Sequence, residues 1–169
     1  MKNYIAKRFQ NISGGLSLDT EALSRYSDVI DMSIGDTDFI TDSRIIDAAF
    51  SDARLGYTKY GDPKGDPDLI DAVIKAYKED FSIDISRENL FVTASSCMGM
   101  GLTMMALLDP GDEVIVFSPY FTMYRSQIEL SGGVCVEVPT YGSEGYAING
   151  DRLRAAITPK TKAIIFNNP

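Results

Sequence analysis

The chain of 169 residues contains no histidine, and this absence restricts its chemistry. Without histidine there is no Ser-His-Asp or Cys-His catalytic unit and no histidine ligand for a metal ion. The two cysteines, Cys97 and Cys135, are too few and too far apart for a zinc cluster or a disulfide framework. We therefore expect no metal site, and we expect a reducing compartment, the cytoplasm, as the location.

Positive charge and long apolar runs are also scarce. Lysine and arginine number 16 against 24 acidic residues, which gives a net charge of −8. A nucleic-acid surface needs clustered Lys and Arg, so we expect no nucleic-acid partner. No stretch approaches the roughly 18 continuous apolar residues of a membrane span, and residues 1–10 contain no apolar core of signal-peptide length. We therefore expect a soluble protein without a membrane partner.

Two helices are predicted in the first half of the chain. Asp42 or Ser43 caps the first, which Gly56 ends. Asp66 and Pro67 begin the second. Its apolar stripe recurs every four residues, at Leu69, Val73, Tyr77 and Phe81. The first 40 residues are irregular apart from a possible short strand at Val29 to Ile34, so we assign residues 1–40 to an N-terminal arm or small-domain segment.

Strands and helices alternate from residue 90 onward. The predicted strands are 90–94, 113–117, 134–138 and 163–166, and the predicted helices are 97–108, 121–130 and 151–157. The continuous apolar run Val114, Ile115 and Val116 is typical of a strand covered on both faces. The pattern predicts the α/β class, with a three-layer α/β/α arrangement around a mainly parallel sheet.

Three segments are candidate binding sites. Val92 to Gly99 runs from a predicted strand into a helix, where exposed amides and the helix dipole suit a phosphate group; an ordinary capped helix start is the alternative. Phe121 follows the second predicted strand and either stacks on a flat cofactor or packs in the core. The loop Tyr57 to Gly61 is either a site or a surface turn.

Ligands of open α/β sheets bind at the carboxyl edge, and the chain ends there, at Asn167 to Pro169. We therefore expect it to be part of a longer protein.

Taken together, these segments resemble the class I/II aminotransferases, which are fold-type I enzymes dependent on pyridoxal 5′-phosphate (PLP). The resemblance extends from about residue 29 to residue 169. It rests on the order and spacing of six segments: 34–39, 56–60 with Gly65, 93–99, 109–114, 119–121 with Tyr124, and 167–169. By this resemblance residues 41–169 are the first part of the PLP-binding large domain.

The resemblance implies a role for several residues at the cofactor. Ser95, Ser96 and Cys97 match the phosphate-binding turn, with the amides of Ser96 and Cys97 facing the PLP phosphate. Phe121 matches the aromatic residue that stacks on the pyridine ring. The family usually has glycine where Ser96 stands and Glu or Gln where Met98 stands, so the chain departs from the family pattern within this turn.

Other matches concern the substrate and a second subunit. Tyr60 matches the tyrosine that reaches the cofactor phosphate of the neighbouring subunit, which implies a homodimer. Gly35 matches the glycine whose backbone lies near the substrate carboxylate. Asn167 and Pro169 match the opening of a conserved stretch of the family. The implied activity is transfer of an amino group between an amino acid and a 2-oxo acid.

No catalytic residue is assigned within the chain. The family's Schiff-base lysine lies further on, and Lys160 and Lys162 precede the last predicted strand, at the opposite edge of the sheet. We therefore expect the 169-residue chain alone to be inactive, and to dimerise or aggregate through unpaired sheet edges. The alternative functions are a PLP-dependent carbon–sulfur β-lyase and a non-catalytic PLP-binding or nucleotide-binding α/β module.

Overall fold

The computed structural model describes residues 4–9, 25–28, 30, 32 and 35–167. The chain divides into two compact units, one of residues 18–93 and one that joins residues 1–17 to residues 94–169. Each unit is described by itself below. The possible strand at residues 29–34 falls mostly outside the described residues. The domain boundary that we expect near residue 40 remains a prediction.

The unit of residues 18–93 is helical, and its helices begin where the capping residues predict. Helix α2 (Ser43–Arg54) has Asp42 as its N-cap, and helix α3 (Pro67–Phe81) has Asp66. Each aspartate carboxylate accepts a hydrogen bond from a backbone N–H of the first turn, at 2.9 Å in both helices. A short 3-10 helix, η2 (Arg87–Asn89), follows. Both predicted helices are confirmed.

The predicted strand at residues 90–94 is wrong. Leu90 is extended, but the segment forms no ladder with another strand among the described residues. The Val92 N–H instead donates to the carbonyl of Lys64, which lies in a loop, at 2.8 Å. An apolar, β-branched segment becomes a strand only when a partner strand supplies regularly spaced hydrogen bonds, and none of the described residues does so.

The unit that contains residues 94–169 is built on a parallel sheet. Its strands are β1 (Glu113–Ser118), β2 (Val134–Pro139) and β3 (Thr161–Ile165), in the order β2-β1-β3. In the central strand, Ile115 lies opposite Val136 on one side and Ile164 on the other. The sheet confirms three predicted strands and the α/β class.

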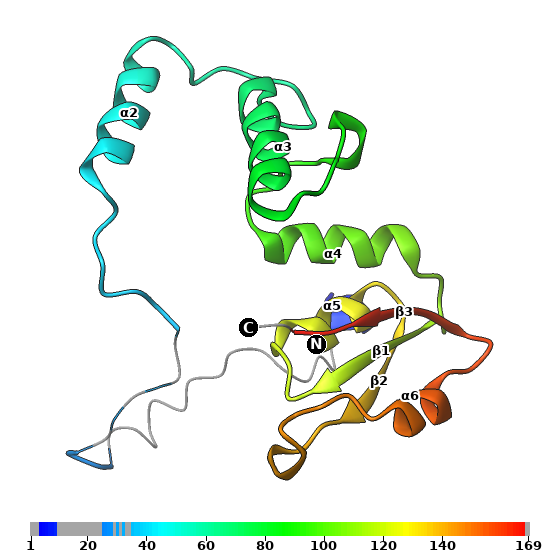
Figure 1. The fold of residues 1–169 in the computed structure, drawn as a ribbon. Helices are drawn as coiled ribbons and strands as arrows, with labels where there is room; N and C mark the ends of the chain where they lie inside the picture. The colour runs from blue at the N-terminus through cyan, green and yellow to red at the C-terminus, as the bar shows by residue number, and fades with distance from the viewer. Residues whose placement is uncertain (1–3, 10–24, 29, 31, 33–34, 168–169) are drawn as a thin grey trace. The chain divides into compact units, whose positions relative to one another are not determined.

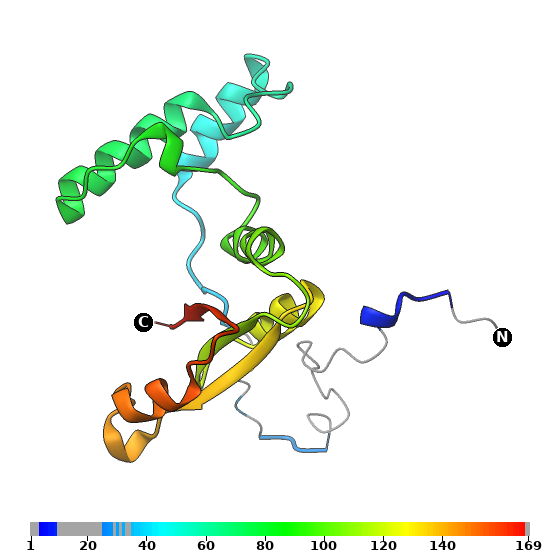
Figure 2. The same ribbon diagram turned by 90° about the vertical axis from the view of Figure 1, so that its right-hand side faces the viewer.

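Helices cover both faces of this sheet. Helices α4 (Ser96–Leu107) and α5 (Met123–Leu130) lie on one face, and α6 (Gly150–Ala156) lies on the other (Figures 1 and 2). Two short 3-10 helices, η1 (Lys7–Phe9) and η3 (Gly142–Glu144), belong to the same unit. The arrangement is the predicted three-layer one.

The side chains of β1 alternate between two apolar clusters, one on each face of the sheet. Val114 and Val116 pack with Ile128 of α5 on one face, and Ile115 and Phe117 pack with α6 on the other. Val114, Ile115 and Val116 are completely buried. The central strand is therefore buried on both sides, as its continuous apolar run predicts.

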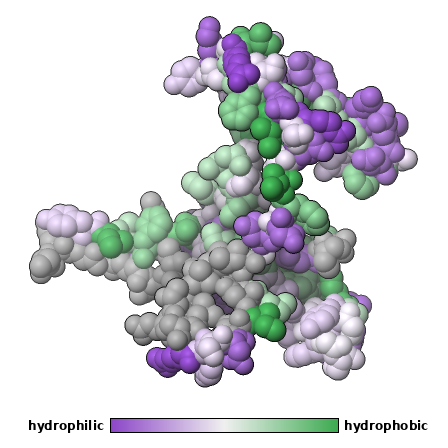
Figure 3. Space-filling model, turned by 90° about the vertical axis from the view of Figure 1, so that its left-hand side faces the viewer, coloured by the Kyte–Doolittle hydropathy of each residue, from purple (hydrophilic) through white to green (hydrophobic). Residues whose placement is uncertain are grey.

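Many large apolar side chains remain on the surface of the described residues. In the helical unit these include Ile45 and Phe50 of α2, and Ile70 is the buried apolar side chain there. Figure 3 shows such hydrophobic residues, in green, lying open among hydrophilic ones. Among the described residues, no helix is long and apolar enough to cross a membrane.

Candidate cofactor site

The N-termini of two helices lie at the carboxyl edge of the sheet. Helix α4 leads into β1 and α5 leads into β2 through short loops, so both helices run antiparallel to the strands (Figure 1). At the opposite edge, Lys162 at the start of β3 donates to the carbonyl of Leu107 at the end of α4, at 3.3 Å. The first turns of both helices therefore face the edge at which open α/β sheets bind ligands.

The first turn of α4 presents backbone amides that have no partner among the described residues. Ser95 is the N-cap, and its Oγ accepts a hydrogen bond from the Met98 N–H at 3.1 Å. The N–H groups of Ser96 and Cys97 precede the first intrahelical donor, and neither bonds to another described residue. The turn holds no acidic side chain. Free amides at the positive end of a twelve-residue helix fit a phosphate group.

Phe121 lies at the same edge, in the loop between β1 and α5. The predicted helix 121–130 begins two residues later than expected, at Met123, with Thr122 as its N-cap. The Phe121 ring is 45% exposed and packs edge-on against Tyr124, with ring centroids 5.7 Å apart. The ring is therefore outside the core, and its outer side is open to a ligand.

A polar cluster of Tyr120, Arg125 and Glu137 connects this aromatic loop to strand β2. The Tyr120 ring stacks on Tyr124 at 6.4 Å, and its hydroxyl donates to the Glu137 carboxylate, which also pairs with Arg125. These hydrogen bonds lower the pKa of Glu137. Burial, together with the bond to Glu137, raises the pKa of Tyr120 to about 12. The cluster therefore keeps Glu137 charged and Tyr120 neutral at physiological pH.

A cavity of about 300 Å³ lies over the ends of the strands. Its lining includes Pro119 after β1, Thr140 after β2 and Asn167 after β3, together with Tyr146. Sequence reasoning placed Asn167 near this edge but missed Thr140 and Tyr146. Thr140 directly follows a predicted strand, so the carboxyl-edge rule was the signal that pointed to it. Pro169 lies outside the described residues.

Gly35 and Tyr60 belong to the helical unit. A Cβ built on Gly35 meets no heavy atom within 4 Å, so its backbone is open to approach. Tyr60 is fully exposed, as is much of Tyr57 beside it. Their roles toward substrate and toward a second subunit remain predictions, as do those of Ser95, Ser96, Cys97 and Phe121.

Two lysines of the sheet unit, Lys160 and Lys162, lie away from the candidate site. Lys160 directly precedes β3, and Lys162 stands at its beginning, where its Nζ lies 3.1 Å from an oxygen of Asp112. Asp112 immediately precedes β1. Both lysines are thus at the amino edge, as the sequence predicts.

Comparison with known proteins identifies the family. The pattern that defines the family described as "Aminotransferase class I and II" matches residues 27–169, and the chain belongs to this family. The chain is 37% identical over 142 residues to the "Probable aspartate/prephenate aminotransferase" of Thermus aquaticus, a match that covers 84% of this chain and 37% of the relative. It is 33% identical over 174 residues to the aspartate aminotransferase of Bacillus sp. (strain YM-2), covering 100% of this chain and 44% of that one.

Solved structures agree with this assignment. A mutant of Thermus thermophilus aspartate aminotransferase matches with a TM-score of 0.87 and 33% identity over 96% of this chain and 44% of that chain. An alanine aminotransferase from Pyrococcus furiosus matches with a TM-score of 0.86 and 31% identity over 95% of this chain and 42% of that one. These comparisons confirm the fold class and the family resemblance. The chain spans less than half the length of these relatives.

Proposed function

We propose that the protein transfers an amino group between an amino acid and a 2-oxo acid, with PLP as its cofactor and as a cytoplasmic homodimer. The observation that carries the proposal is the pair of amides at Ser96 and Cys97, which have no partner among the described residues and lie at the carboxyl edge of the sheet in a chain of this family. Aspartate is the first amino donor to test, because the relatives named above are aspartate and aspartate/prephenate aminotransferases.

In this proposal the described residues bind and orient the cofactor. PLP supplies an electron sink that makes the α-hydrogen of an amino acid acidic. The Ser96 and Cys97 N–H groups donate to its phosphate, and the dipole of α4 adds attraction for the negative charge. The half-exposed face of Phe121 lies against the flat ring and excludes water from it. We assign no proton transfer to these residues.

The proposed homodimer is supported by the exposed tyrosine loop. Tyr57 and Tyr60 present most of their surface to solvent, although large aromatic side chains usually find apolar cover. In a dimer Tyr60 would reach the cofactor phosphate of the second subunit. A reducing location is supported by the two cysteines, both of which are free.

The test is an amino-transfer assay on the protein expressed from its complete coding sequence. Aspartate labelled with ¹⁵N is supplied with a set of 2-oxo acids, with and without PLP, and labelled amino acids are detected by mass spectrometry. We expect PLP-dependent transfer of the label. The 169-residue chain alone is the control, and we expect no turnover from it, because Lys160 and Lys162 lie at the amino edge.

Two results would contradict the proposal. One is the absence of label transfer from aspartate and from every other amino acid tested as donor. The other is release of ammonia and pyruvate from cysteine conjugates without amino transfer, which would identify a carbon–sulfur β-lyase.

A further inference from the structure

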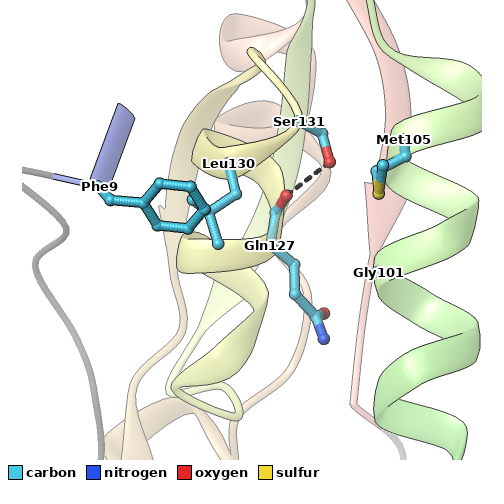
Figure 4. A pocket seen from close by; sticks show the side chains of 6 residues that line it. All are labelled: Phe9, Gly101, Met105, Gln127, Leu130 and Ser131. Atoms are coloured by element: carbon cyan, nitrogen blue, oxygen red, sulfur yellow. Dashed lines mark hydrogen bonds between the residues drawn. The ribbon is translucent and has the colours of Figure 1, made fainter. Parts of the chain in front are cut away.

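Gln127 connects the second of the two edge helices to the phosphate turn of the first. Its Nε2 donates to the main-chain carbonyl of Cys97 at 2.8 Å and lies 3.2 Å from the Cys97 Sγ. Because a carbonyl oxygen only accepts hydrogen bonds, the nitrogen of the carboxamide must face Cys97. Figure 4 shows the side chain extending from α5 into the space beside α4.

The peptide group between Cys97 and Met98 is thereby held at both ends. Its carbonyl accepts from Gln127, and its N–H donates to the Oγ of Ser95. A peptide group is planar and rigid, so these two bonds restrain the backbone directly after the Cys97 Cα. The amides of Ser96 and Cys97 directly precede this restrained group in the first turn of α4, so a displacement of the group would turn them as well.

Packing alone does not select a glutamine at this position. The Gln127 side chain lies against Gly101 of α4 and borders a cavity of about 420 Å³, and neither neighbour requires an amide. Its Oε1 is buried and has no partner among the described residues. A leucine would fill the same space without burying an unpaired oxygen, which is unfavourable. Stability alone therefore does not account for an amide here.

We propose that Gln127 is a positioning residue that orients the Ser96 and Cys97 amides toward the phosphate group of the cofactor. The inference rests on the function proposed above. It adds to the phosphate site a residue that lies 30 positions after Cys97, on a different helix. Gln127 itself does not touch the phosphate; it acts through the main chain of Cys97.

The test compares the affinities for PLP and for pyridoxal, which lacks the phosphate. Gln127→Leu removes the donor, and Gln127→Glu keeps the size of the side chain but replaces the donor by an acceptor. We expect both variants to bind PLP five- to tenfold more weakly and pyridoxal within twofold of the wild type. The thermal midpoint of Gln127→Leu should stay close to that of the wild type, because the loss of the bond to Cys97 is offset by removal of the unpaired buried oxygen. Ser131→Ala is the matched control, since its hydroxyl bonds to the Gln127 backbone and not to the turn.

The outcomes separate this inference from the proposed function. If the wild type binds PLP more tightly than pyridoxal and the Gln127 variants keep that ratio, the positioning role is overturned and the cofactor site stands. An equal loss of affinity for both ligands also overturns it, because it indicates a general structural effect. If the wild type does not distinguish the two ligands, both the inference and the phosphate site fail.

Discussion

At the scale of single residues, the candidate site consists mainly of backbone. In the function proposed above, the N–H donors of Ser96 and Cys97 at the start of α4 bind the phosphate, and their side chains are secondary. This makes the site tolerant of side-chain type, which agrees with a serine and a cysteine where small residues suffice. It also means that ordinary side-chain substitutions test the site poorly.

A substitution to proline removes one backbone donor selectively. Ser95 is extended, with φ −163° and ψ 159°, which is the conformation that proline requires of the residue before it, and proline is well tolerated at the first helical position. We expect Ser96→Pro to weaken PLP binding by about 10- to 100-fold, since a hydrogen bond to a charged group contributes about 1.5–3 kcal/mol. Equilibrium titration with PLP measures the effect.

Ser96→Ala is the matched control for this prediction, because it removes the hydroxyl and keeps the N–H. We expect its PLP affinity to remain within a few-fold of the wild type. Equal affinities for the proline and alanine variants would show that the Ser96 amide does not hold the phosphate.

At the scale of elements, Gly65 allows the loop before α3 to pack closely against the segment after η2. Gly65 has φ +125°, and a Cβ there would lie 2.6 Å from the Val92 Cβ and 2.3 Å from its Cγ2. The Val92 Cβ is fixed to the backbone and cannot rotate away. The hydrogen bond between Val92 and the Lys64 carbonyl depends on this close approach.

We expect Gly65→Ala to destabilise this element by about 2–4 kcal/mol, from backbone strain and the contact with Val92. Hydrogen exchange of the Val92 amide should accelerate, and the midpoint of denaturant unfolding should fall. Gly61→Ala is the control, because a Cβ there meets nothing within 4 Å. Identical exchange rates in the two variants would refute the role of Gly65.

At the scale of the whole molecule, the described sheet has two open edges. Strands β2 and β3 each pair with β1 on one side only. Exposed apolar residues lie on these strands, including Val134 of β2 and Ile164 of β3. An apolar, unpaired edge is a template for association with another chain.

We therefore expect the 169-residue chain, expressed alone, to sediment as a dimer or a larger species at micromolar concentration. Ile164→Lys, which places a charge on an edge strand, should shift the distribution toward the monomer. Analytical ultracentrifugation measures both. A monodisperse wild-type monomer would contradict this prediction.

Local chemistry made most of the fold predictable. Asp42 and Asp66 mark the starts of α2 and α3, and Gly56, with φ +96°, follows the end of α2. The run at Val114 to Val116 identifies the central strand. The segment 90–94 has the same apolar, β-branched character and is nevertheless no strand, because pairing depends on partners distant in sequence.

The sequence alone determined the alternation of elements and the family, since caps, glycines and apolar periods act within a few residues of each other. Only the tertiary structure decided that Gln127 bonds to Cys97, and that Tyr120, Arg125 and Glu137 meet behind Phe121. These contacts join residues 12 to 30 positions apart, except for the neighbouring Arg125 and Tyr120. Their geometry follows from how α4, α5 and β2 pack, and no local pattern encodes that packing.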